Sequence, residues 1–246
     1  MESGFDRVYC DPKTGVLRNR LGITDKERLE IEEAKISSAL AKEIRAMPFI
    51  RADMDIAFFK DLHRTLLGDV FDWAGEYRRS DIGITFDHTS YIPWQTVPEK
   101  TEGVFEYIKK HTGFKSHPYG KKIAQLALVF GCLKNFQPFR DGNTRTSLLF
   151  TSILGSNCGV ALDWSLLDTH QFGLAQVKAR DNDFQMLIYQ FAGISFPLEE
   201  RPELRYPKAL PSNGRTILQQ LEDMKKARSA WQDEKSATQK KKHLER

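Results

Sequence analysis

Apolar residues recur at helical spacing over most of the chain and predict a mainly α-helical fold. The predicted helices cover residues 24–47, 55–67, 97–110, 123–133, 147–153, 168–180 and 184–191. The first of them begins with Thr24-Asp25-Lys26-Glu27, the pattern of a capping box that Glu27 closes, and Pro48 ends it. A core of helices is therefore expected, with loops where proline and glycine interrupt the period.

A different period appears in residues 80–93, where Ile82, Ile84 and Phe86 alternate with polar residues. This alternation predicts a β-hairpin, the only convincing strand signal in the chain. His88 in the same segment is interpreted as a solvated loop residue. An ordinary surface hairpin would give the same pattern.

The pattern also suggests how the chain is organised. Residues 1–23 form an N-terminal segment, residues 24–195 one domain, and the proline-rich residues 196–214 a linker. Residues 215–246 begin with an amphipathic helix that carries Ile217, Leu221 and Trp231, and the end from Lys235 on is expected to be disordered. The tail carries nine basic and five acidic residues, so the whole net charge of +4 belongs to it. A tail of this kind packs on its own domain or is simply solvated, and it can also contact an anionic membrane, nucleic acid or a partner helix.

Composition narrows the class further. The 246 residues are enough for one large domain or one domain with an appendage. The three cysteines, Cys10, Cys132 and Cys158, are odd in number and far apart, which argues against a disulfide framework or a zinc site. No apolar run has membrane-spanning length and the first residues lack a secretory core, so a cytoplasmic protein with no transmembrane segment is expected. We also expect no DNA partner.

Candidate chemistry lies in Phe136-Gln-Pro-Phe-Arg-Asp-Gly-Asn-Thr-Arg-Thr-Ser-Leu148, between two predicted core helices. Its proline and glycine predict a loop that feeds a helix N-terminus, where unpaired N–H groups attract anions. Arg140, Asn143 and Arg145 are candidate phosphate donors, and Asp141 would need a bridging cation beside a phosphate, which implies Mg²⁺. Taken alone, Asp-Gly-Asn is also a common plain turn.

The stretch resembles the signature loop of the Fic (Fido) family, H-P-F-x-[D/E]-G-N-x-R-x-x-R, whose members transfer AMP from ATP to protein hydroxyls. Six positions agree: Pro138, Phe139, Asp141, Gly142, Asn143 and Arg145. Two differ, because Gln137 stands at the position of the catalytic histidine and Leu148 at that of the second arginine. The motif loop spans residues 137–148.

A second segment, from His63 to Arg78, resembles the family's H-R-x-L-x-x-D-x-F-x-W-A-G-x-x-R run, although Trp73 by itself would be interpreted as a core aromatic. The resemblance implies a Fic helical bundle with a short β-hairpin flap, at about residues 79–94, over the active site. In the family such a flap docks the target backbone as an added strand. The candidate docking residues are Ile82, Ile84, Thr85 and Phe86.

The resemblance also implies roles within the loop. Asp141 would hold Mg²⁺ on ATP, and Gly142, Asn143 and the helix N-terminus the α-phosphate. Arg145 would neutralise the leaving pyrophosphate, with Arg140 and Thr144 completing the nucleotide site. The histidine would deprotonate the attacking hydroxyl, and a glutamine cannot do this. The sequence therefore predicts a Fic-type protein adenylyltransferase whose transfer activity is impaired at Gln137.

Several alternatives stay open. The chain could be a pseudoenzyme that binds nucleotide or protein, or Gln137 could be an engineered substitution in an active enzyme. A Doc-like phosphotransferase is a further alternative, because such relatives also end the motif with R-T-x-L. No [S/T]-x-x-x-E-[G/N] helix is found, so self-inhibition by that motif is unsupported, and an antitoxin-like inhibitor would act in trans. The family also includes toxins and effectors delivered into a host cytosol.

Overall fold

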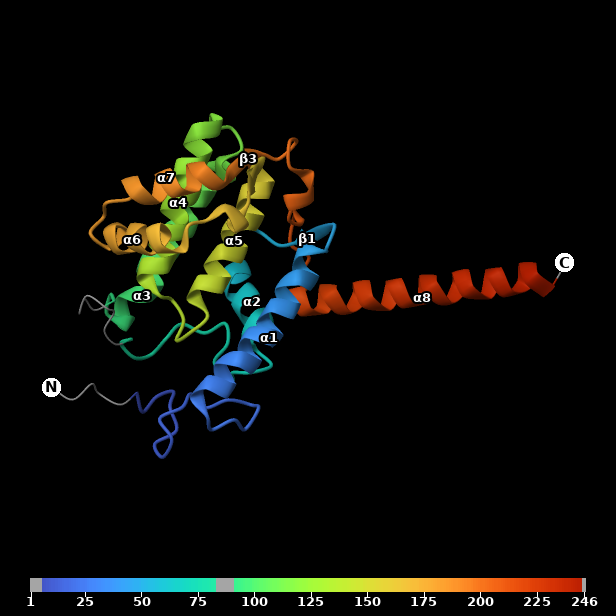
Figure 1. The fold of residues 1–246 in the computed structure, drawn as a ribbon, viewed down its shortest axis with the longest axis horizontal. Coiled ribbons are helices and arrows are strands. Elements are labelled where there is room, and N and C mark those ends of the chain that lie inside the picture. Colours follow the sequence, from blue (N-terminus) through green and yellow to red (C-terminus); the bar gives the residue numbers. More distant parts are fainter. Residues whose placement is uncertain (1–5, 83–90, 245–246) are drawn as a thin grey trace.

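The computed structural model describes residues 6–82 and 91–244 and consists mainly of helices. Two long helices, α4 (Tyr119–Phe136) and α5 (Asn143–Cys158), form its centre (Figure 1). The other helices are α1 (Lys26–Arg45), α2 (Ile56–Leu67), α3 (Val97–Lys110), α6 (Thr169–Arg180), α7 (Gln185–Ile194) and α8 (Ile217–Leu244). Short 3-10 turns are η1 (Trp94–Thr96), η2 (Thr112–Phe114), η3 (Trp164–Leu166) and η4 (Pro202–Leu204). The predicted mainly helical fold is confirmed.

Helix α1 begins differently from the expectation. Its N-cap is Asp25, whose carboxylate accepts the N–H of Arg28 at 2.8 Å. The proposed capping box of Thr24 and Glu27 is therefore wrong by one residue. Aspartate caps a helix as well as threonine does, and Glu27 then lies in the first turn, where the helix dipole favours an acidic side chain.

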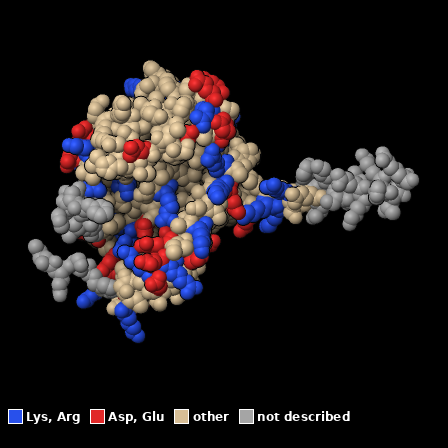
Figure 2. All heavy atoms as spheres, in the orientation of Figure 1, with Lys and Arg blue, Asp and Glu red and all other residues tan. Residues whose placement is uncertain are grey.

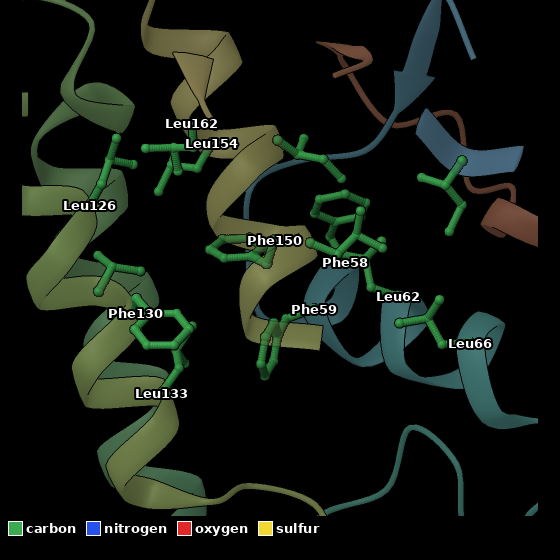
Figure 3. Close-up of a cluster of buried hydrophobic side chains, with 14 of the residues drawn as sticks. Phe58, Phe59, Leu62, Leu66, Leu126, Phe130, Leu133, Phe150, Leu154 and Leu162 are labelled. Atoms are coloured by element: carbon green, nitrogen blue, oxygen red, sulfur yellow. The ribbon is translucent and has the colours of Figure 1, made fainter. Parts of the chain in front are cut away.

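The core is built where α2, α4 and α5 meet (Figure 3). Phe59 of α2 is its hub: its ring contacts those of Phe105, Phe139 and Phe150 at centroid distances of 5.5, 5.3 and 5.5 Å. Leu126, Phe130 and Leu133 line the facing side of α4 and are fully buried. Because Phe139 belongs to the loop between α4 and α5, the same core that joins the helices also anchors this loop.

In the described part of the chain, four strands of three residues each lie outside the region where the sequence predicts strands. β1 (Phe49–Arg51) pairs in parallel with β4 (Lys208–Leu210), and β2 (Val160–Leu162) pairs antiparallel with β3 (Ser195–Pro197). Residues 196–214, the suggested linker, are therefore held to the helical body by strand pairing. Of the predicted hairpin, residues 83–90 lie outside the described part, and with them Ile84, Thr85, Phe86 and His88; Ile82 is described and half-buried.

Helix α8 starts on the body and then extends away from it (Figure 1). Asp61 accepts the N–H of Ile217 at 2.8 Å, Gln220 bonds the backbone of Arg51, and the Ile217 and Leu221 side chains are buried. The helix continues through the segment from Lys235 that was expected to be disordered. Basic and acidic side chains lie interspersed around α1 and the base of α8 (Figure 2). Among the described residues, no helix is both long and apolar enough to cross a bilayer.

Candidate functional site

The loop between α4 and α5 has a left-handed backbone conformation at both of its ends. Gln137 ends α4 with φ 45° and ψ 65°, and Gly142 precedes α5 with φ 72° and ψ 3°. Asn143 closes the loop from inside: its Oδ1 accepts the Phe139 N–H at 2.9 Å and its Nδ2 donates to the Phe139 carbonyl at 2.7 Å. Asn143 therefore acts first on the shape of the loop, a role that the sequence did not reveal.

The first turn of α5 is open to an anion. No side chain caps this helix, and its first backbone bond is the one from Thr146 N–H to the Gly142 carbonyl. The N–H groups of Asn143, Thr144 and Arg145 have no acceptor among the described residues. Unpaired N–H groups at a helix N-terminus carry partial positive charge and bind phosphate well. The predicted anion site therefore has the required backbone geometry.

Asp141 lies at the edge of this turn. Its Oδ1 accepts the Gly142 N–H at 2.6 Å, and Oδ2 has no protein donor in the described part of the chain. The described residues contain no cluster of three or more His, Cys, Asp or Glu that could hold a metal by themselves. A hard cation at Asp141 would therefore take most of its oxygens from phosphate and water, as Mg²⁺ commonly does.

His63 holds the loop by a hydrogen bond and by ring stacking. Its Nδ1 accepts the Gly75 N–H at 2.8 Å, so the proton lies on Nε2, which donates to the Asp141 carbonyl at 2.9 Å. The imidazole also stacks on Phe139 with the ring centroids 3.7 Å apart. Burial lowers the pKa of His63 to about 3, so the ring stays neutral and acts as a fixed hydrogen-bond bridge.

Arg78 supports the same loop from its other end. Its side chain is fully buried, and Nε donates to the Gln137 carbonyl at 2.8 Å. The other guanidinium nitrogens donate to the carbonyls of Ser80, at 2.9 Å, and Ile92. A buried cation bound by several carbonyls fixes all of them relative to one another. The sequence signal for both supports was the His63–Arg78 segment, but their contacts could not be inferred from it.

Gln137 does not face outward as a free group. Its Nε2 donates to the Lys134 carbonyl at 2.7 Å, one turn back in α4, and the residue is only 7% exposed. The amide thus satisfies a carbonyl at the C-terminal end of the helix, which would otherwise lack a partner. A neutral amide in this position can donate or accept a hydrogen bond but cannot take up a proton near neutral pH.

Both predicted phosphate arginines have carboxylate partners in the protein. Arg145 is bound by Glu33 of α1 at 2.6 Å and donates to the Ser37 hydroxyl at 2.7 Å, while Arg140 is bound by Asp6 at 2.6 Å. Burial raises the pKa of Glu33 even though Arg145 opposes the shift. These two arginines are positioned by segments that precede the loop by more than a hundred residues.

Leu148, at the second departure from the motif, is half-buried and lines a cavity of about 230 Å³ between α1 and α5. Arg145, Lys42 and Trp164 line the same cavity. Leu148 is thus part of the cavity wall, and as an apolar side chain it supplies no charge there.

The sequence of this chain matches a known protein family and several of its members. Residues 53–154 match the Fic/DOC family. The chain is 30% identical over 184 residues to the probable protein adenylyltransferase y4lH of Sinorhizobium fredii, which covers 72% of this chain and 90% of y4lH. The chain belongs to the Fic/DOC family. It is also 27% identical over 176 residues to the protein adenylyltransferase VbhT of Bartonella schoenbuchensis, which covers 72% of this chain but only 36% of VbhT.

Solved structures agree on the fold. The N-terminal Fic domain of a Bartonella effector protein from Bartonella sp. AR 15-3 aligns with a TM-score of 0.73 and 22% identity, over 81% of this chain and 96% of that domain. The BepC protein of Bartonella tribocorum, solved with bound AMPPNP, aligns with a TM-score of 0.69 and 22% identity, over 79% of this chain and 99% of that one. The Fic fold expected from the resemblance is confirmed.

Proposed function

We propose that this chain is a Fic-type protein adenylyltransferase domain that binds ATP with Mg²⁺ at the N-terminus of α5 and is impaired in AMP transfer. The relatives named protein adenylyltransferase and the AMPPNP bound by BepC support the nucleotide site. The observation that carries the proposal is the pairing of an open α5 N-terminus with a Gln137 amide that is bonded to the Lys134 carbonyl. The site keeps its anion-binding groups and lacks a proton acceptor.

The residues fit a bound Mg²⁺–ATP. Asp141 would hold the cation through its free oxygen, and the N–H groups of the first turn of α5 would hold the phosphates. The cation would neutralise charge on the triphosphate. Asn143, His63 and Arg78 keep the loop in the shape that presents these groups. In the active reaction a base takes the proton of the attacking hydroxyl, and general-base catalysis contributes about 10²–10⁴-fold, so its loss would leave transfer slow but binding intact.

The test is calorimetric titration with ATP, with and without Mg²⁺. The native chain is compared with Asp141→Ala and with the control Asp53→Ala, an exposed carboxylate at the opposite end of α2 from His63. We expect Mg²⁺-dependent binding by the native chain and by Asp53→Ala, and loss of the Mg²⁺ dependence in Asp141→Ala. Absence of binding by the native chain, or binding that Asp141→Ala leaves unchanged, would overturn the proposal.

A further inference from the structure

Lys134 is a cation beside the proposed nucleotide site that the family motif does not include. It lies in the last turn of α4, and its Nζ reaches across to α5, where it donates to the Thr144 hydroxyl at 2.7 Å. Thr144 belongs to the first turn of α5, whose N–H groups are open. The ammonium of one central helix is therefore held against the anion-binding end of the other.

The usual structural role of such a lysine does not account for this position. A basic residue in the last turn of a helix ordinarily interacts with the free carbonyls of its own helix. At the end of α4 the Lys134 carbonyl accepts a hydrogen bond from the Gln137 side chain, and the Gln137 carbonyl accepts one from Arg78. The lysine side chain itself donates to Thr144. An ammonium has three N–H donors. In the described part of the chain only one of them is used, and Lys134 forms no ion pair.

The surroundings of Lys134 disfavour its charged form when no anion is bound nearby. Lys134 is half-buried, and burial lowers its pKa; the nearby Arg180 lowers the pKa further, and Asp141 opposes the shift. The positive end of the α5 dipole adds to the same unfavourable field. A poorly solvated ammonium beside a helix N-terminus is stabilised when a negatively charged group binds between them.

We propose that Lys134 is a further phosphate-binding residue of the nucleotide site, held by the Thr144 hydroxyl so that its free N–H groups meet the phosphate oxygens at the first turn of α5. This inference rests on the proposed nucleotide function. It adds a point charge from α4 to the backbone N–H groups of α5, so that both central helices take part in binding. The Thr144 hydroxyl has the role of a guide, because it accepts one N–H of the ammonium and fixes the direction of the other two.

The experiment compares four proteins in titrations with Mg²⁺–ATP: the native chain, Lys134→Met, Lys134→Arg and Lys121→Met. Methionine keeps an unbranched side chain and removes the charge, and arginine keeps the charge. Lys121 is an exposed lysine near the start of the same helix and serves as the matched control. Because a hydrogen bond to a charged group contributes roughly 1.5–3 kcal/mol, Lys134→Met should weaken ATP binding about 10- to 100-fold. Lys134→Arg and Lys121→Met should stay within about threefold of the native chain.

A thermal melt of each protein separates binding from folding. Removal of a poorly solvated ammonium should leave the Tm of Lys134→Met unchanged or raised, so that affinity falls while stability does not. ATP affinity unchanged in Lys134→Met, in a native chain that does bind ATP, would overturn this inference and leave the proposed function standing. Equal losses of affinity in Lys134→Met and Lys134→Arg with a lowered Tm would assign a packing role and also overturn it. A native chain without ATP binding would overturn both.

Discussion

Gly142 is the residue of the loop with the least room for change, and Gly142→Ala gives a sharp test of the loop geometry. Its φ of 72° lies in the left-handed region, which costs a non-glycine residue about 1–3 kcal/mol. A Cβ at this position would lie 2.2 Å from Leu67 Cδ1 and 3.3 Å from His63 Nε2. Overpacking of this kind costs about 1–3 kcal/mol, since a buried leucine must move. The two effects together predict that Gly142→Ala lowers the free energy of unfolding by about 2–6 kcal/mol.

The assay is urea unfolding followed by circular dichroism, with ATP titration of the same samples. The matched control is Gly103→Ala in α3, where a Cβ would meet no atom within 4 Å and alanine should stabilise the helix by about 0.5–1 kcal/mol. The steric part can be isolated with Leu67→Ala: in that background Gly142→Ala should cost about 1–3 kcal/mol less. A Gly142→Ala protein as stable as Gly103→Ala, with native ATP affinity, would refute the loop geometry described here.

Three further predictions concern single side chains around the loop. Gln137→His should raise AMP transfer by roughly 10²–10⁴-fold in a labelled-ATP incorporation assay, and no gain would contradict a missing base as the cause of impairment. Arg78→Met should destabilise the fold by about 2–5 kcal/mol in urea, because the buried Gln137 carbonyl and the partly buried Ser80 carbonyl lose their donor, whereas exposed Arg79→Met should change little. Similar values for both variants would contradict the supporting role of Arg78. The pKa of Glu33 is raised by burial above its ordinary value of 4.5, so the folded state keeps this proton to higher pH than the unfolded state. The contribution of Glu33 to stability should therefore fall as pH rises from about 4.5 through its folded pKa, and Glu33→Gln should remove that slope from a pH series of unfolding curves; equal slopes would refute it.

Helix positions were predictable because each helix buries one face. The i, i+3, i+4 pattern of apolar residues in 55–67 and 123–133 corresponds to α2 and α4, with Phe59 and Phe130 inside the core. The strands were not predictable by the same reasoning. A strand of three residues is too short to show a period of two, and β1 finds its partner β4 more than 150 residues away.

The candidate site also has one part that the sequence predicted and one part that it could not predict. The local order Pro138-Phe139-Arg140-Asp141-Gly142 was enough to place a loop before a helix N-terminus. The partners of its side chains depend on long-range packing, so neither the pairing of Arg145 with Glu33 nor that of Arg140 with Asp6 could be inferred. Lys134 was overlooked because an isolated lysine near a helix end gives no signal until the neighbouring helix is known.

Under the proposed function, the supports of the loop would allow nucleotide binding and AMP transfer to be separated. His63 and Arg78 hold the loop by backbone carbonyls, those of Asp141 and Gln137, and these two contacts do not involve the side chain at position 137. The open N–H groups at the start of α5 follow directly on Asn143, whose side chain is bonded to the Phe139 backbone and not to residue 137. Under the proposed function, glutamine at this position would remove a proton acceptor and leave the open first turn of α5 in place. Under the proposed function, a histidine placed there would meet the same left-handed backbone and the same carbonyl of Lys134 as Gln137 does, so a base could be restored without rebuilding the loop.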